Sequence, residues 1–271
     1  MTSSRAVRSV AIAILCAVYF AGIFAGYLTN YSYATQFREL PNAAPSALHL
    51  FGTDSLGRDL FARVVYGTRV SLLLAPAAAL ISTAIATLLG CAAGFAGGWL
   101  EKTILAAGDL SLSLPLLLVL LALRAVLPLN ISPIISVVAT FVLLGVLGWP
   151  ASLRIVWGAA RSLRDADFVL LARASGCSRW RLLTRHVAPN LRPVMLAQFW
   201  IAIPLFVLTE ATLSMLGLGV MEPMASWGNL LKGLEDFSAV RANPWSLAPL
   251  ILLIVVVISF QLVLPQREEI A

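Results

Sequence analysis

The hydrophobic positions of this chain form six long runs separated by polar segments, and each run is continuously apolar over about 20–27 residues. A helix of that length crosses a hydrocarbon core of roughly 30 Å, whereas the strands of a membrane barrel would alternate apolar with polar positions. We therefore predict an all-α, polytopic membrane protein. The six expected spans cover residues 7–28, 70–96, 104–127, 133–157, 193–218 and 245–264.

Composition agrees with this class and narrows the chemistry. Hydrophobic residues make up 60% of the 271 and charged residues 12%, about half the charged fraction of an ordinary soluble domain. Arginine-rich inner loops account for the net charge of +6, so we expect no nucleic-acid partner. Three cysteines, far apart and without a CxxC pair, predict neither a disulfide framework nor a metal site.

The first apolar run follows Arg5 and Arg8, a pattern shared by secretory signals and retained helices. Its apolar stretch, residues 10–28, is longer than the roughly 7–15 apolar residues of a signal peptide, and no clear cleavage site precedes the polar 30–33 segment. We expect a retained first span.

Arginine and lysine positions set the expected orientation. Six spans place both termini on one side, and termini inside leave twelve basic residues in inner segments against seven outside. Eight of the twelve lie between Arg154 and Arg192, so we expect both termini in the cytoplasm. The expected organisation is 1–28 for the N-terminus and first span, 29–69 for an outer loop, 70–265 for a core of five spans with an inner loop at 158–192, and 266–271 for a cytoplasmic tail.

The end of the first outer loop predicts an amphipathic helix. Leu60, Phe61 and Val64 share one helical face, and Asp59 is spaced to pair with Arg63 one turn later. We expect this helix to lie in the membrane interface before the second span, with a solvated surface helix as the alternative.

Glycines and prolines mark where the spans pack or bend. Gly90, Gly94 and Gly98 recur every fourth residue, as do Gly22 and Gly26, and such faces allow close helix contact in lipid. Prolines inside spans predict kinks in helices that line the bundle interior or a pathway. These prolines are Pro115, Pro150 and Pro204.

Residue patterns typical of catalysis are missing. Lys102 and Lys232, the only lysines, follow no glycine-rich phosphate loop, so this chain is not expected to hydrolyse ATP by itself. His49 and His186, the only histidines, are predicted on opposite sides of the membrane, which leaves no basis for a hydrolytic triad or a metal site. We expect a non-catalytic transport subunit that binds no cofactor of its own.

Two acidic residues fall inside expected spans, where ionisable groups often mark function. Asp109 lies near the start of the third span, and we expect it to be solvated at the interface. Glu210 lies deeper, in the fifth span, and we expect it to face a wet cavity or a hydrogen-bonding helix. A proton relay needs a chain of such groups, so Glu210 is interpreted as structural or pathway-lining.

The longest inner loop, residues 165–190, carries the clearest pattern. Asp165 and Asp167 suit a helix start and Gly176 a helix stop, and a second short helix is expected over residues 179–186. The two helices mix apolar residues with arginines, which suits docking into a groove of another protein. A basic loop lying on anionic lipid is the alternative.

This loop resembles the EAA motif of ABC-importer permeases through Ala172, Gly176 and Pro189, the proline thirteen residues after the glycine. Blocks at 51–59 with 66–72 and at 208–219 with 226–229 are similar to the dipeptide/oligopeptide/nickel importer family, C-type subunit. The resemblance assigns to the ATPase-coupling loop Asp167, Leu171, Ala172, Arg173, Ala174, Gly176, Arg179 and Pro189. It assigns to family motifs and a possible pathway or gate Gly52, Thr53, Asp54, Gly57, Arg58, Asp59, Glu210, Gly217, Gly219 and Trp227.

The resemblance implies a type I ABC importer permease fold in a bacterial inner membrane. Its expected partners are a homologous second permease, two ATPase subunits or domains that bind ATP and Mg²⁺, an extracytoplasmic substrate-binding protein, and membrane lipid. Leu170 and Leu171 depart from the motif, whose first two positions are usually acidic and alanine. Peptides are the expected substrate; nickel or another small solute, and less so a stand-alone secondary transporter, are the alternatives.

Overall fold

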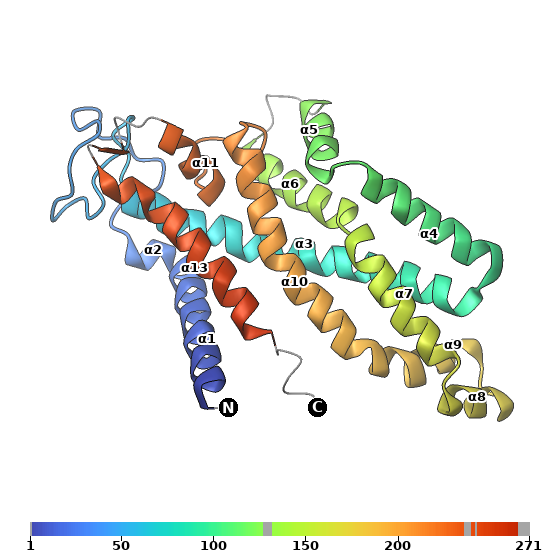
Figure 1. Cartoon of the computed structure of the whole chain (residues 1–271). Coiled ribbons are helices and arrows are strands. Elements are labelled where there is room, and N and C mark those ends of the chain that lie inside the picture. The colour runs from blue at the N-terminus through green and yellow to red at the C-terminus, as the bar shows by residue number, and fades with distance from the viewer. Residues whose placement is uncertain (1, 127–131, 236–239, 242, 265–271) are drawn as a thin grey trace. The chain divides into compact units, whose positions relative to one another are not determined.

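The computed structural model describes residues 2–126, 132–235, 240–241 and 243–264 (Figure 1). Most of these residues are helical, the longest irregular segment is the 29–59 loop, and the only strand-like pairings among them are two isolated β-bridges. The all-α prediction is confirmed. The longer helices are α1 (Thr2–Ile23), α3 (Leu60–Ala96), α4 (Gly98–Ser113), α5 (Leu116–Val126), α6 (Pro133–Leu147), α7 (Pro150–Arg164), α10 (Ala188–Met215) and α13 (Ala248–Val263). The shorter ones are α2 (Ala25–Leu28), α8 (Asp167–Ala174), α9 (Arg179–Leu182), α11 (Trp227–Lys232), a π-helix at Leu183–Val187 and 3₁₀ turns at Gly233–Glu235 and Pro244–Leu247.

Five helical segments of the described chain are each long and apolar enough to cross a membrane, and a bent pair makes up to six. The five are Arg5–Ile23, Leu60–Ala96, Pro133–Arg164, Arg185–Met215 and Pro244–Val263. The bent pair is α4 with α5, joined at an angle of 80°. The six predicted spans therefore correspond to helices of this structure, apart from Leu127, which lies outside the described residues. The predicted tail at 266–271 lies outside them as well.

The separate interfacial helix predicted before the second span is not observed. Leu60 instead begins α3, which runs unbroken for 37 residues into the span. Asp59 caps this helix, because its Oδ2 accepts a hydrogen bond of 2.7 Å from the backbone N–H of Ala62. The apolar face that suggested an interfacial helix is buried in protein, including Val64 and Val65. The amphipathic pattern was right, but protein rather than lipid covers its apolar face.

Two of the three predicted proline positions coincide with breaks. Pro115 lies in the break between α4 and α5, where the chain turns by 80°. Pro150 begins α7, a position where its missing N–H removes no helical hydrogen bond. Pro204, by contrast, lies inside the continuous α10, and Pro76 likewise inside α3.

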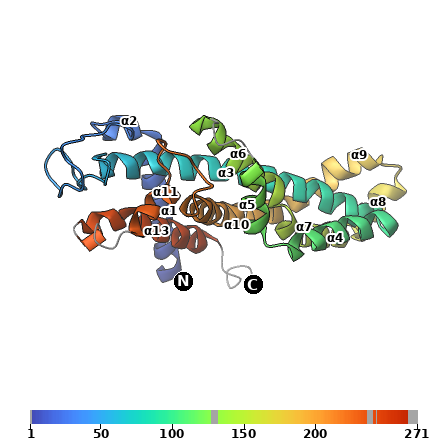
Figure 2. The ribbon, with the colours of Figure 1, turned by 90° about the horizontal axis from the view of Figure 1, so that it is seen from above.

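The chain divides into two compact units. The first comprises Met1–Pro76, Leu121–Phe141 and Ile203–Ala271, and the second Ala77–Leu120 and Val142–Ala202, within the described ranges. In the first unit, α1 lies along α13 (Figures 1 and 2). A side chain at Gly22 would meet the backbone of Arg69 at 3.2 Å, and one at Gly26 the hydroxyl of Tyr66 at 3.5 Å. These glycines of the N-terminal run therefore lie at a close helix contact, as predicted, and the partner helix is α3.

In the second unit, glycines hold the last turns of α3 against α7. A Cβ at Gly90 would lie 2.8 Å from Cγ1 of Val156, and one at Gly94 would lie 3.0 Å from Cβ of Ala160. Gly98 takes no part, because α3 ends at Ala96 and no atom lies within 4 Å of a Cβ built there. The predicted contact face is thus confirmed for two of its three glycines.

Candidate functional site

The inner loop forms a knob, here defined as α8, Gly176 and α9. Gly176 ends α8 with φ of +77°, a conformation that side chains rarely adopt. Its N–H donates to the carbonyl of Arg173, and the N–H of Cys177 donates to the carbonyl of Ala172, both at 3.0 Å. These two bonds make a Schellman cap, which satisfies carbonyls at the end of the helix. The predicted helix stop at Gly176 is confirmed.

The second half of the knob differs from the prediction of an isolated short helix. Helix α9 covers Arg179–Leu182 and is followed directly by a π-helical turn, Leu183–Val187, and then by α10. Pro189 has no backbone N–H to donate to the preceding turn. The wider π-helical turn lies directly before it, and the helix continues through the proline into α10. The side chain of Arg179 lies outside the described part of the structure.

A small apolar core fixes the knob to its own unit. Val169 is fully buried and packs in one cluster with Ala160 of α7 and with Leu182, Val187 and Leu191. One face of α8 is therefore anchored. The other face carries exposed apolar side chains, and these are Phe168, Leu170 and Leu171, the last with 71% of its surface exposed.

Two positions at which the resemblance departs from its motif lie on this exposed face. Leu170 and Leu171, where the resemblance leads us to expect an acidic residue and alanine, are open to solvent in the isolated chain. Exposed large apolar side chains next to Gly176, where nothing lies within 4 Å of an added Cβ, are typical of an interaction surface. Ala174 and Arg173 are exposed beside them.

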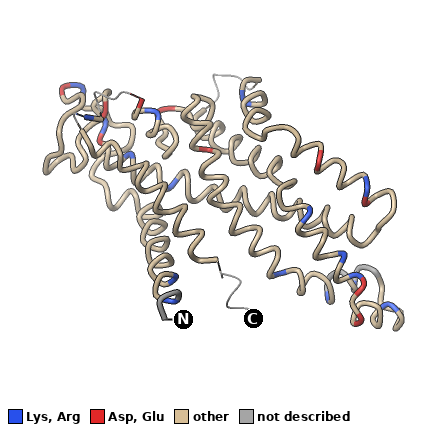
Figure 3. Tube along the Cα trace, in the orientation of Figure 1, with Lys and Arg blue, Asp and Glu red and all other residues tan. Residues whose placement is uncertain are grey.

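Charges surround the knob rather than fill its core, and Figure 3 shows them gathered along the α7–α9 segment. The Arg164 guanidinium, whose Nε lies 2.9 Å from Oδ1 of Asp165, holds the pKa of that carboxyl below its usual range. Arg173 lies over the ring of Phe95, 5.8 Å from its centroid. Asp167 lies in the first turn of α8, where a negative charge stabilises the helix through its dipole.

A cavity of about 810 Å³ adjoins the knob within the second unit. Its lining is largely apolar and includes Cys91, Phe95, Leu182 and Met195, with Arg173 also contributing. None of these residues belongs to a group of three or more metal-ligating side chains, and the described residues contain no such group.

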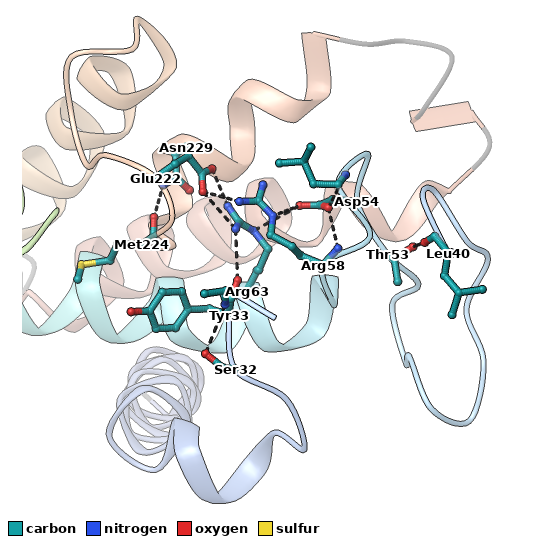
Figure 4. A network of polar contacts seen from close by, with 12 residues as sticks. Ser32, Tyr33, Leu40, Thr53, Asp54, Arg58, Arg63, Glu222, Met224 and Asn229 are labelled. Atoms are coloured by element: carbon teal, nitrogen blue, oxygen red, sulfur yellow. Dashed lines mark hydrogen bonds and ion pairs between the residues drawn. The ribbon is translucent and has the colours of Figure 1, made fainter. Parts of the chain in front are cut away.

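A second set of the sequence-predicted residues meets in the first unit, where the 29–59 loop folds onto the start of α3. Figure 4 shows Arg58 and Arg63 both directed at Glu222, which lies between α10 and α11. Arg58 Nη1 lies 2.5 Å from Glu222 Oε2, and Arg63 Nη2 lies 2.8 Å from Glu222 Oε1. Asp54 completes the network, accepting from Arg58 Nε at 2.7 Å. The network joins the two segments that the sequence places outside the membrane.

The i,i+4 pair expected between Asp59 and Arg63 does not form. Oδ1 of Asp59 instead lies 2.9 Å from Nδ1 of His49, and its other oxygen caps α3. Arg63, with a fully buried side chain, is taken by Glu222 and Asp54. Asp59 and Arg63 thus each pair with a residue from elsewhere in the fold, and these tertiary contacts outweigh the local i,i+4 spacing.

Two glycines of the outer motif make turns that no other residue fits. Gly52 has φ of +72° and its Cβ position lies 2.3 Å from the carbonyl oxygen of Ala43. Gly57 has φ of +71° and its Cβ position lies 2.1 Å from the carbonyl oxygen of Phe37. Thr53, between them, donates its hydroxyl to the carbonyl of Leu40. These residues shape the loop, and none of them contacts a cavity named above.

Glu210 is the centre of a buried polar cluster in the first unit. Its Oε2 accepts from the hydroxyl of Ser71 on α3 at 3.1 Å, and its Oε1 accepts from Ser214 on α10 at 2.7 Å. Ser71 in turn accepts from the backbone N–H of Trp227 at 3.1 Å. The carboxylate thus links α3, α10 and α11. The sequence predicts that Glu210 faces either a wet cavity or a hydrogen-bonding helix, and in the structure it hydrogen-bonds to a neighbouring helix.

The remaining motif residues fit helix α11 against α10. Gly217, with φ of +80°, ends the α10 segment with the same cap as Gly176, since Leu218 N–H donates to Leu213 at 2.9 Å. A Cβ at Gly219 would lie 2.0 Å from the hydroxyl of Ser214. Trp227 is buried, and its Nε1 donates to Thr68 on α3 at 3.1 Å.

Sequence reasoning missed Arg124, a buried arginine on α5. Its Nε donates to the carbonyl of Leu218 at 2.7 Å, and its Nη2 donates to Gly219 at 2.9 Å and to Ser136 at 2.7 Å. It therefore satisfies two carbonyls in the turn that follows α10, near the C-terminus of that helix, where a positive charge is favourable. The signal was available, because an arginine inside an apolar run must find such partners. Glu222 gave no comparable signal.

Known proteins resemble the chain over most of its length. Residues 86–265 match the family described as binding-protein-dependent transport system inner membrane component. An oligopeptide transport system permease protein of Bacillus subtilis strain 168 is 33% identical over 244 residues, which are 90% of this chain and 77% of that protein. A dipeptide transport system permease protein of Alkalihalophilus pseudofirmus is 32% identical over 255 residues, 94% of this chain and 81% of that one.

Two further relatives extend the range. A protein of Brucella suis biovar 1, named as a peptide permease, is 36% identical over 204 residues, and the match spans 75% of this chain and about two thirds, 66%, of that protein. A glutathione transport system permease protein of Pectobacterium atrosepticum is 32% identical over 240 residues, 88% of this chain and 77% of that one. With its apolar helices and the knob broken at Gly176, the chain belongs to the family of binding-protein-dependent transport system inner membrane components.

Proposed function

We propose that this chain is the membrane-spanning permease subunit of an ATP-driven importer of peptides, and that it forms half of the translocation pathway. The observation that carries the proposal is the knob, a two-helix element anchored on one face by Val169 and exposing Phe168 and Leu171 on the other. The names of the relatives support the substrate, since they refer to peptides, dipeptides, oligopeptides and glutathione. None of these four names refers to nickel.

The proposal assigns a partner protein to each side of the membrane. The knob would dock into an ATPase subunit in the cytoplasm, and the loops joined by the Arg58–Arg63–Glu222 network would face the extracytoplasmic substrate-binding protein. A homologous second permease would supply the other half of the pathway. ATP and Mg²⁺ would be bound by the ATPases and not by this chain, which acts as a transport subunit without catalysis of its own.

Uptake in cells tests the proposal. A strain lacking this chain should lose uptake of labelled di- and oligopeptides, and expression of the wild-type chain should restore it. Depletion of ATP should abolish the restored uptake, whereas a protonophore applied with ATP held constant should leave it intact. Uptake that follows the ion gradient instead would favour a secondary transporter and would overturn the proposal.

A further inference from the structure

Helices α4 and α7 of the second unit carry an exposed ion pair inside their apolar stretches. Arg154 Nη2 lies 2.6 Å from Oδ2 and 2.7 Å from Oδ1 of Asp109, and Arg154 Nε lies 3.0 Å from Oδ1. The contact uses both oxygens of the carboxylate and two nitrogens of the guanidinium. Yet 47% of the Asp109 side chain and 57% of the Arg154 side chain are exposed on this chain.

Asp109 lies four residues before the end of α4 at Ser113, and Arg154 lies four residues after the start of α7 at Pro150. A second ion pair, Arg161 with Glu101, joins the same two antiparallel helices at 2.6 Å near the charged end of α4. Eight residues on α4 and seven on α7 separate the two pairs, a distance of about 10–12 Å along the helices at 1.5 Å per residue. The sequence predicts that Asp109 is solvated at the interface. Along α4, Asp109 lies further from the charged end of the helix than Glu101 does.

A glycine lies beside the pair where the two helices approach. A Cβ at Gly108 would lie 2.5 Å from Cδ2 of Leu153 on α7, so a larger residue would require that side chain to move. The ion pair therefore lies at a close contact between α4 and α7. The charges are nevertheless directed to the surface of this chain.

Lipid is an unsuitable cover for that surface. Charged side chains inside spans face a protein interior or a water-filled cavity, because acyl chains cannot solvate them. Small or polar exposed residues lie one turn from the pair, and these are Ala106 and Ser113 on α4 and Ala151 and Gly158 on α7. Leu112, one turn from Asp109 on α4, is exposed as well, as are Leu110 and Ile155 on the neighbouring faces. The charged pair and the small residues beside it, rather than the whole surface of the two helices, are therefore unsuited to lipid.

We infer that Asp109 and Arg154 line the translocation pathway and bind the charged termini of a peptide in transit; this inference rests on the proposed function. The carboxylate can accept from a peptide ammonium group, and the guanidinium fork matches a peptide carboxylate bidentately. A zwitterionic peptide can replace the contact between the two side chains, so no charge is left unpaired in either state. The ligand class is peptides with free termini, in preference to peptides acetylated or amidated at their ends.

Paired uptake measurements test the binding role. Arg154→Gln should reduce uptake of peptides with a free C-terminus by roughly tenfold or more, the usual effect of losing a charged hydrogen bond, and should affect C-amidated peptides less. Asp109→Asn should show the matching preference for the N-terminus. Arg161→Gln, which removes the ion pair with Glu101, is the matched control and should alter the preference for neither terminus.

Accessibility tests the pathway role without depending on the charge variants. In a chain with Cys16, Cys91 and Cys177 replaced by serine, Ala106→Cys and Gly158→Cys in the assembled importer should react with a membrane-impermeant thiol reagent. Added peptide should slow that reaction. Leu110→Cys and Ile155→Cys, on the neighbouring faces, should react much more slowly and without protection by peptide.

The outcomes separate this inference from the proposed function. Wild-type cells that take up no peptide at all would overturn the function itself. Normal peptide uptake, combined with unlabelled Ala106→Cys and Gly158→Cys, would overturn the pathway role alone. Equal loss for free and blocked peptides in Arg154→Gln, with normal amounts of complex in the membrane, would overturn terminus binding and leave a structural ion pair.

Discussion

At the scale of single residues, Glu210 shows how one carboxylate organises three helices. It is fully buried and accepts hydrogen bonds from Ser71 and Ser214, while Ser71 also holds the backbone of Trp227. A buried acceptor of this kind leaves unsatisfied donors if it is removed. The carboxylate of Glu210 therefore holds α3 and α10 together, and Ser71 connects it to α11.

Glu210→Leu should destabilise the protein by about 1–3 kcal/mol, because it strands two buried hydroxyl groups. Glu210→Gln keeps an acceptor and should lose less. The free energy of unfolding in mixed micelles containing increasing SDS measures both. Thr209→Val is the control, since the exposed hydroxyl of Thr209 donates only to Leu205 in its own helix. An equal free energy of unfolding for Glu210→Leu and the wild type would show that the polar cluster around Glu210 does not stabilise the protein.

At the scale of elements, the knob is a short helix whose direction is set by a single turn. The cap at Gly176 fixes where α8 ends, and the buried Val169 fixes which face of α8 meets α7 and α10. Both features are local in sequence. Helix α9 then continues through the π-helical turn into α10, and all of these residues up to Ala202 belong to the second unit.

Gly176→Val should uncouple the knob without preventing insertion. A β-branched residue at φ of +77° is strained by about 1–2 kcal/mol, so the turn and the direction of α8 should change. Peptide-stimulated ATPase activity of the assembled importer should fall to its basal level, while the amount of chain in the membrane stays normal. Gly233→Val is the matched control, because nothing lies within 4 Å of its Cβ and its φ is −62°. Full stimulation in Gly176→Val would contradict the coupling role.

Elements also show what the sequence could and could not predict. Runs of apolar residues are sufficient for the spans, and the Gly176 stop follows from backbone geometry alone. The expected interfacial helix failed because burial of Val64 depends on distant segments. The contact of Glu222 with Arg63 joins residues 159 positions apart, and no local spacing encodes it. The candidate site was thus predictable where it is local and hidden where it is tertiary.

At the scale of the whole molecule, charge distribution is the main guide to how the chain sits in its membrane. The chain carries 19 basic and 13 acidic residues, and the basic ones concentrate between Arg154 and Arg192. Positive segments are retained in the cytoplasm during insertion. The knob lies in this segment. With six spans the termini lie on the same side of the membrane as the knob, so an experiment that locates the termini also locates the knob.

Both termini should lie in the cytoplasm. A reporter that is active only in the cytoplasm should give signal when fused to either end, and a reporter active only outside should give none. A fusion inserted after Glu39, in the 29–59 loop, should give the opposite pattern and serves as the control. Outside signal from both termini, with inside signal from the loop, would invert the orientation and move the knob away from any ATPase.

The contact of α3 with α7 through Gly90 and Gly94 has a mechanical consequence. The α3 side of this contact has no side chain that could change rotamer, and it faces backbone atoms of Trp157 and Arg161 together with the short side chains of Val156 and Ala160. A contact of this kind can absorb little displacement by side-chain rearrangement. Helix α7 leads into the knob within the same unit, so a displacement of the knob should be transmitted to the last turns of α3 with little loss.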